Sequence, residues 1–297
     1  MNTSDFLIQC IQRFGVNGWA VRNFHNLQHS NLSRQLKEGI LFMCEKLFHL
    51  LIMILGERYQ PGIGKCTLQQ FYEREIIHLL YLDNASFADI KEAIPHASYK
   101  EIKEALDRVS DLVIFTDISN VTTEKYKLKE AFVDQINPFY YHYSSPQYNQ
   151  AGYIRRERAS TSITSCLPPK APEFEDNLKP ILRIFKHPLF VQLLFNAIDR
   201  YDQRNEFSSE RLLRRAMFLM AMALEEELNG SLKHPTNEPS FSQQAESLEI
   251  FKLLGSDFES KNETLIILSQ WIMEKFDELK NPQRFAEISL QDVIMQE

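Results

Sequence analysis

The sequence is poor in glycine and cysteine, and each shortage excludes a kind of site. It has 9 glycines in 297 residues and contains no Walker loop, dinucleotide-binding glycine pattern or G-x-S-x-G motif. Its cysteines lie far apart without a C-x-x-C pair, so we expect neither a thiolate zinc site nor a disulfide framework. They are Cys10, Cys44, Cys66 and Cys166. We therefore predict no catalytic, cofactor-binding or metal-binding residues, and a reducing, cytoplasmic location, with the nucleus as an alternative.

The sequence also lacks an excess of positive charge. It has 33 basic against 40 acidic side chains, a formal net charge of -7, which disfavours binding to nucleic acid or anionic membranes. No signal peptide is recognisable, and no stretch approaches the ~20 apolar residues that span a bilayer. The most apolar segment, 39–55, is interrupted by Glu45, Lys46 and His49, and we interpret it as a buried helix. We expect no nucleic-acid partner and no membrane partner.

Histidine and charge clusters do not indicate a site either. Of the 8 histidines, His25 and His29 have the i, i+4 spacing of a metal pair, but two imidazoles without a close carboxylate hold zinc weakly. His78 lies within an apolar helix and is interpreted as hydrogen-bonded rather than metal-binding. Consecutive acidic residues at 225–227 point in different directions from a helix, and we interpret the basic run at 155–158 as part of a solvated segment.

Three helix starts occur within about thirty residues. Thr67, Ser86 and Ser98 are each followed three residues later by Gln, Asp or Glu, the pattern of a capping box. Each cap precedes an apolar helical face, and the β-rich segments 111–117 and 124–130 follow. Three helices followed by a hairpin is the order of a winged helix.

The predicted fold is mainly α, a helical scaffold with an embedded winged-helix domain of three helices plus a β-hairpin. A segment rich in tyrosine, proline and serine follows the hairpin and predicts a linker, after which amphipathic helices resume, one of them capped by Ser260. The predicted division is 1–65 N-terminal helical scaffold, 66–136 winged helix, 137–174 linker and 175–297 C-terminal helical scaffold.

The third helix of the winged helix argues against DNA reading. Residues 98–111 carry three basic and four acidic side chains, whereas phosphate contacts need a surplus of cations. A structural or protein-docking winged helix is therefore favoured over a nucleic-acid reader.

Four segments resemble the central region of the UBR family of ubiquitin-protein ligases. They are "MILGERYQPGIGK" (53–65), "EREIIHLLYL" (73–82), "FYYHYSSPQ" (139–147) and "LPPKAPEFE" (167–175), and the resemblance spans most of residues 40–280. It implies an α-helical scaffold with a winged helix. In that family this scaffold lies between a zinc-binding UBR box, which reads destabilising N-terminal residues, and a RING, which recruits the ubiquitin-conjugating enzyme.

The resemblance implies a central scaffold segment that positions substrate relative to the conjugating enzyme in ubiquitin-dependent (N-degron) degradation. The dispersed cysteines cannot supply a UBR box or RING. We therefore expect a fragment or truncated product without zinc or a catalytic site of its own. Its expected partners are the other domains of the same ligase, the conjugating enzyme and substrate proteins. The alternatives are a non-catalytic winged-helix interaction subunit of a large complex and a nucleic-acid-binding winged helix.

Overall fold

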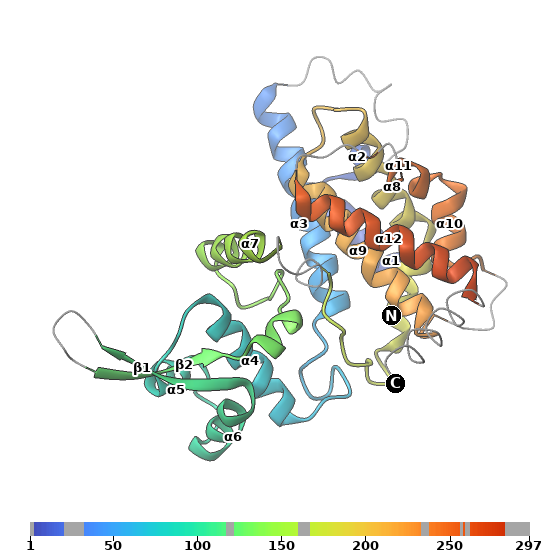
Figure 1. Ribbon diagram of the computed structural model, residues 1–297. Coiled ribbons are helices and arrows are strands. Elements are labelled where there is room, and N and C mark those ends of the chain that lie inside the picture. The colour runs from blue at the N-terminus through green and yellow to red at the C-terminus, as the bar shows by residue number, and fades with distance from the viewer. Residues whose placement is uncertain are drawn as a thin grey trace, which may run out of the picture. The chain divides into compact units, whose positions relative to one another are not determined.

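The computed structural model describes residues 3–20, 33–116, 122–159, 167–232, 238–255, 258 and 262–282; of 116, 145 and 155–159 it describes the backbone alone. His25, His29, Cys166 and Ser260 lie outside these residues. The chain divides into two compact units (Figure 1). One combines Met1–Ile52 with Pro180–Glu297, and the other is Met53–Lys179. We describe each unit by itself.

In the described residues of the first unit, all regular secondary structure is helical. Helix α9 runs along its core with twelve buried side chains and packs against α8 and α12. Ser209 caps α9, and His187 caps α8, in which Pro188 occupies the first turn. The elements are α1 (Thr3–Arg13), α2 (Asn17–Ala20), α3 (Arg34–Gly56), the 3₁₀ helix η5 (Lys179–Lys186), α8 (Pro188–Asp202), α9 (Glu210–Leu228), α10 (Phe241–Ser247), α11 (Ile250–Leu253) and α12 (Glu263–Lys280).

Helix α12 begins later than its predicted cap suggests. Asn262 is the N-cap, and its side chain accepts a hydrogen bond from the backbone N–H of Thr264. Asparagine is among the best N-cap residues because its side-chain oxygen satisfies an otherwise unpaired helix N–H. On its apolar face Leu265, Leu268 and Ile272 are buried, whereas Trp271 is only partly buried.

Helix α3 is longer than the apolar stretch read from the sequence. By length and composition it could cross a membrane, as could the bent pair of η5 and α8, but the core helix of a soluble protein passes the same test. Its inner face is buried at Leu47, Phe48 and Leu51. The interrupting charge at Glu45 is accommodated because Glu45 accepts a hydrogen bond from Ser209 Oγ at 2.7 Å.

The second unit contains the winged helix, and its three predicted capping boxes are present at Thr67, Ser86 and Ser98. Strands β1 and β2 are antiparallel, with Ser110 opposite Leu128 and Thr116 opposite Thr122. The elements are α4 (Leu68–Leu82), α5 (Phe87–Ala93), α6 (Tyr99–Val109), β1 (Ser110–Thr116), β2 (Thr122–Leu128), the 3₁₀ helix η3 (Glu130–Gln135) and α7 (Ser145–Ala159). The mainly-α fold with a winged helix is thereby confirmed.

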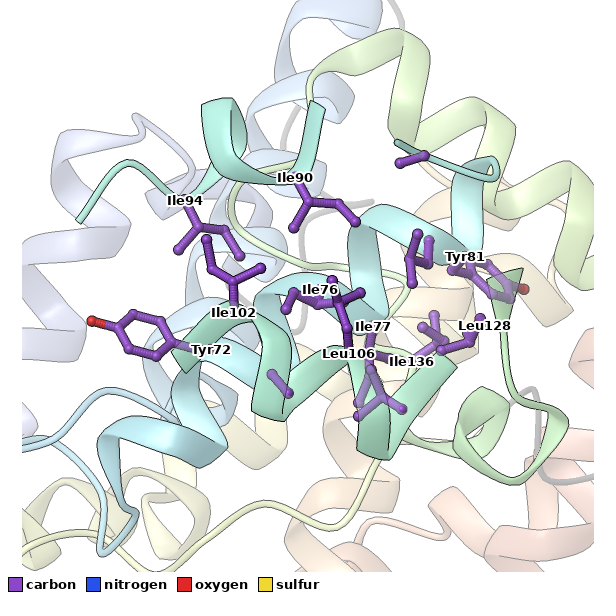
Figure 2. Packing of buried hydrophobic residues seen from close by; sticks show 14 of the residues in the cluster. Tyr72, Ile76, Ile77, Tyr81, Ile90, Ile94, Ile102, Leu106, Leu128 and Ile136 are labelled. Atoms are coloured by element: carbon purple, nitrogen blue, oxygen red, sulfur yellow. The ribbon is translucent and has the colours of Figure 1, made fainter. Parts of the chain in front are cut away.

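One apolar cluster holds the winged helix together. Figure 2 shows Ile76 of α4, Ile90 of α5 and Ile102 and Leu106 of α6 converging, with Leu128 of β2 beside them. The i, i+3 and i+4 spacing within each helix places these side chains on one face. Burial of a side chain of this size contributes about 1.5–3 kcal/mol to the stability of the fold. The three helices are therefore stabilised by packing against one another.

The structure differs from the predicted linker at 137–174. Phe139 and Tyr140 are buried, and Ala151 of α7 packs into the winged-helix core. Helix α7 starts where Gln147 Oε1 accepts hydrogen bonds from the backbone N–H and the hydroxyl of Ser144. This cap is not among the predicted helix starts. The weak apolar periodicity concealed the helix, because α7 buries few of its described side chains.

Candidate functional site

Two of the resembling segments, 53–65 and 167–175, lie side by side although more than a hundred residues separate them in sequence. Gly64 forms a β-bridge with Phe174, and Lys65 N donates to Glu173 O at 2.7 Å. Tyr59 Oη donates to the backbone oxygen of Lys170 at 2.7 Å. Backbone pairing of this kind closes a long loop at its two ends.

Gly64 is required by this close approach. A Cβ added there would lie 1.8 Å from the backbone oxygen of Arg58, a separation that no side chain tolerates. Arg58 is itself buried, donates to Leu55 O at 2.8 Å and holds its guanidinium 4.2 Å from the centre of the Phe174 ring. This cation–π contact adds to the attachment of 167–175.

The other two resembling segments meet at His78 of α4. Its imidazole stacks on Tyr140 with ring centres 4.0 Å apart, and its Nε2 accepts from Asn137 N at 3.0 Å. Nδ1 lies 2.8 Å from Arg74 O and therefore carries the proton. Burial, with the Arg74 charge as a smaller cause, lowers the pKa of His78 well below its usual value. His78 is a neutral, hydrogen-bonded core residue, as its apolar helix suggests.

Arg74 links the two pairs of segments. Its Nη2 lies 2.8 Å from Glu57 Oε1 and 2.9 Å from Oε2, and Glu57 Oε1 also accepts from Asn137 Nδ2 at 2.9 Å. The guanidinium lies 4.0 Å from the Tyr59 ring centre and 5.4 Å from that of Tyr140. We call these five residues the Arg74 joint. It fixes α4 to both neighbouring segments with charge-assisted and cation–π contacts.

The wing carries exposed apolar side chains. Leu112 and Ile114 lie on one face of β1 and are 53% and 70% exposed, and Phe115 on the opposite face is 42% exposed. Strand β2 pairs with β1 along one edge and bridges to Ala85 through Tyr126, which leaves β1 as the outer strand of the hairpin. Exposed apolar residues on an outer strand are typical of a surface that pairs with another protein.

Two of the three cations of α6 pair with neighbouring carboxylates. Arg108 Nη1 lies 2.6 Å from Glu73 Oε1, and Lys100 Nζ lies 3.7 Å from Glu104 Oε1. With Lys103 added, α6 has three cations against Glu101, Glu104 and Asp107. The helix that would enter a DNA groove in a reader of this fold therefore has no surplus positive charge.

Among the residues that the structure describes, no group of three or more His, Cys, Asp or Glu side chains could hold a metal ion. Cys10, Cys44 and Cys66 are free thiols. The predicted weak pair, His25 and His29, lies outside the described residues. The basic run at 155–158 lies within helix α7, and its side chains are likewise not described.

Comparison with known protein families decides the identity of the winged helix. Residues 71–168 match the winged-helix domain of the UBR1-like E3 ubiquitin-protein ligases. The chain contains a UBR1-like winged-helix domain. The E3 ubiquitin-protein ligase ubr-1 of Caenorhabditis elegans is 28% identical over 93% of this chain. UBR1 of Mus musculus is 25% identical over 94% of it, and UBR1 of Drosophila melanogaster is 25% identical over 77%.

The chain spans only a small part of the length of these relatives. The matches cover 14% of the worm protein, 16% of the mouse protein and 13% of the fly protein.

The four segments were recognisable in the sequence, but the network that joins Glu57, Arg74 and Tyr140 was not predicted. The available signal was an arginine in the middle of an apolar helix, which requires a buried partner.

Proposed function

We propose that this chain is the central scaffold segment of a UBR-type E3 ubiquitin-protein ligase. In this role it holds bound substrate at a defined distance from the ubiquitin-conjugating enzyme in the N-degron pathway. The observation that carries the proposal is the match to UBR1 and UBR2 ligases across most of the chain. The Arg74 joint supports it, because a positioning element must resist bending between its parts.

The mechanism is geometric. A substrate lysine held near a loaded conjugating enzyme reacts as though it were present at high local concentration. A stiff body maintains that concentration, whereas a loosened body spreads the lysine over a larger volume. In this mechanism the segment contributes to the rate through position alone.

The test uses the full-length ligase that contains this segment, with Arg74→Met in the joint and Lys252→Met as a matched control. Lys252 is an exposed cation on α11 that pairs with Glu249 at 3.6 Å. Three quantities are measured: substrate binding, discharge of loaded conjugating enzyme to free lysine, and ubiquitin transfer to bound substrate. We expect transfer to bound substrate to fall about tenfold or more with Arg74→Met, while the other two stay unchanged. A parallel loss of all three, or no loss of transfer, would refute a positioning role.

The exposed wing favours a second candidate, a non-catalytic interaction subunit of a larger complex. Leu112 and Ile114 would then contact a stable partner. Purification of the endogenous protein separates the two candidates: a stoichiometric complex without ubiquitination activity supports the subunit, and a longer polypeptide with ligase activity supports the scaffold.

The balanced charge of α6 disfavours the third candidate, a nucleic-acid reader. We expect no mobility shift of duplex DNA at low salt, the condition that most favours phosphate contacts. A mobility shift that reports DNA binding, with an affinity that falls steeply as the salt concentration rises, would support that candidate.

A further inference from the structure

A small pocket opens beside the Arg74 joint, between α4, the end of α5 and the start of α7. Leu79 and Leu82 of α4, Ile94 after α5 and Tyr143 form apolar walls, and Glu75 contributes a carboxylate. Its volume is about 230 Å³, below the ~300 Å³ at which small-molecule sites begin. The pocket has room for one side chain of a partner rather than for a metabolite or cofactor.

The carboxylate of Glu75 has only long contacts to hydrogen-bond donors, although its side chain is only 12% exposed. His142 Nε2 lies 3.6 Å away and Tyr141 Oη lies 3.5 Å away, both at or beyond the limit of a hydrogen bond. Within the described part of the chain, no lysine or arginine pairs with Glu75; the adjacent Arg74 is committed to Glu57. A largely buried charge without a cation is costly, and a ligand cation would remove that cost.

Tyr140 adds a second acceptor to the same pocket. The residue is 5% exposed, and its buried hydroxyl oxygen has no hydrogen-bond partner of standard geometry in the described residues. Burial, then the Glu75 charge and the approach of the hydroxyl to the Glu75 carboxylate, raise the pKa of Tyr140, so the hydroxyl stays neutral and its oxygen can accept from a donor.

We propose that this pocket binds a cationic side chain, lysine or arginine, from a partner protein. Glu75 and the Tyr140 hydroxyl receive the charged head, and Leu79, Leu82 and Ile94 contact its methylene stem. Long basic side chains bury their stems against apolar surface in this way. The charge complementarity of one carboxylate and one cation identifies the class of partner. The biological meaning of the contact depends on the proposed scaffold role, because a scaffold needs contacts to other proteins or to other parts of the ligase.

The test is a titration of the whole chain, carrying labelled isoleucine and leucine methyl groups, with single-residue probes followed by NMR. The probes are N-acetyl-lysine methylamide, N-acetyl-arginine methylamide and the neutral N-acetyl-norleucine methylamide. We expect the two cationic probes to shift the methyl resonances of Ile94 and Leu79 at millimolar concentration. The norleucine probe should bind at least about tenfold more weakly, because it lacks the charge-assisted hydrogen bond to Glu75.

Two variants and one control make the assignment specific. Glu75→Gln keeps the shape of the side chain and should weaken the cationic probes at least about tenfold without affecting norleucine. Tyr140→Phe removes only the hydroxyl and should weaken binding of the cationic probes less than Glu75→Gln does. Glu104→Gln on exposed α6 should change nothing. The methyl resonances of Ile102 and Leu106, which are buried in the winged-helix core, check that each variant remains folded.

The proposal is overturned if norleucine binds as well as lysine, if Glu75→Gln leaves binding of the cationic probes unchanged, or if none of the probes shifts the pocket methyl groups. Binding can be lost in this way while the ubiquitin-transfer test still supports the scaffold. Conversely, the pocket can bind a cation in a chain that has no positioning role. The two proposals therefore fail separately.

Discussion

The Arg74 joint leads to the most informative prediction about stability. Arg74→Met keeps the length of the side chain and removes its charge, which leaves Glu57 without its bidentate partner and the Tyr59 ring without its cation. Removing one member of a buried ion pair costs about 3–5 kcal/mol because the other charge stays buried and unpaired. Some of this cost is relieved by Asn137, whose amide continues to donate to Glu57, so we expect about 3 kcal/mol.

A second substitution separates the charge from the packing. Glu57→Gln in the Arg74→Met background keeps an oxygen that accepts from Asn137 and removes the unpaired charge. We expect the double variant to be more stable than the sum of the single effects indicates, with an interaction energy toward the upper end of about 0.5–3 kcal/mol. If the two losses simply add, the pair does not stabilise the joint in the way described.

The assay must report on the second unit alone. The chain has 2 tryptophans, Trp19 and Trp271, and both lie in the first unit, so tryptophan fluorescence serves as an internal control that should not change. Hydrogen exchange of the amides in α4 (Leu68–Leu82) measures the opening free energy of the joint. Lys100→Met is the matched control, because Lys100 is 84% exposed at its side chain and its i, i+4 pair contributes about 0.3–0.5 kcal/mol. The reasoning is refuted if exchange in α4 is the same for Arg74→Met and for that control.

Three further predictions address packing, backbone and pH. Ile102→Ala empties part of the winged-helix core, where Ile102 is fully buried, and should cost about 2–5 kcal/mol in urea unfolding followed by circular dichroism. Gly64→Ala should destabilise the second unit by more than about 1 kcal/mol, because the new methyl group overlaps a backbone oxygen, whereas Gly152→Ala on α7, with open space around it, should stabilise it by about 0.5–1 kcal/mol. Burial lowers the pKa of His49 to about 4 and that of His78 well below 6.5. As the pH falls, these histidines therefore take up protons in the unfolded chain before they do so in the folded chain. The free energy of unfolding should have its full value above about pH 6.5 and should fall toward pH 4 by at most about 1.4 kcal/mol per pH unit for each histidine.

Each of these predictions has an outcome that contradicts it. Ile102→Ala must differ from Tyr99→Ala, since Tyr99 is mostly exposed; equal effects would mean that the cluster does not hold the three helices together. Equal effects of the two glycine substitutions would mean that the loop at 57–65 adapts to a side chain. For pH, the urea midpoint of His78→Phe should depend less on pH than that of the wild type, and an equal dependence would exclude His78 as a cause.

The local elements of the winged helix were predictable because their causes are local. Each capping box joins a hydroxyl to the residue three positions later, and the apolar spacing after it selects one helical face. The hairpin follows from short β-rich segments separated by a polar turn. Helix α7 was missed although Ser144 and Gln147 form a local cap at its start, because neither its apolar spacing nor its composition distinguishes it from a linker.

The sequence by itself determined that the chain is mainly helical, that a winged helix begins near residue 67, and that four segments are similar to the UBR family. Only the tertiary structure decided that those segments come together in pairs and that Arg74 links them, since Glu57 and Asn137 stand 80 positions apart. It also decided that Glu75 is largely buried and, among the residues that the structure describes, has no lysine or arginine partner. The physical reason is that burial and ion pairing depend on which distant side chains pack around a group, whereas capping and periodicity depend on neighbours a few positions away.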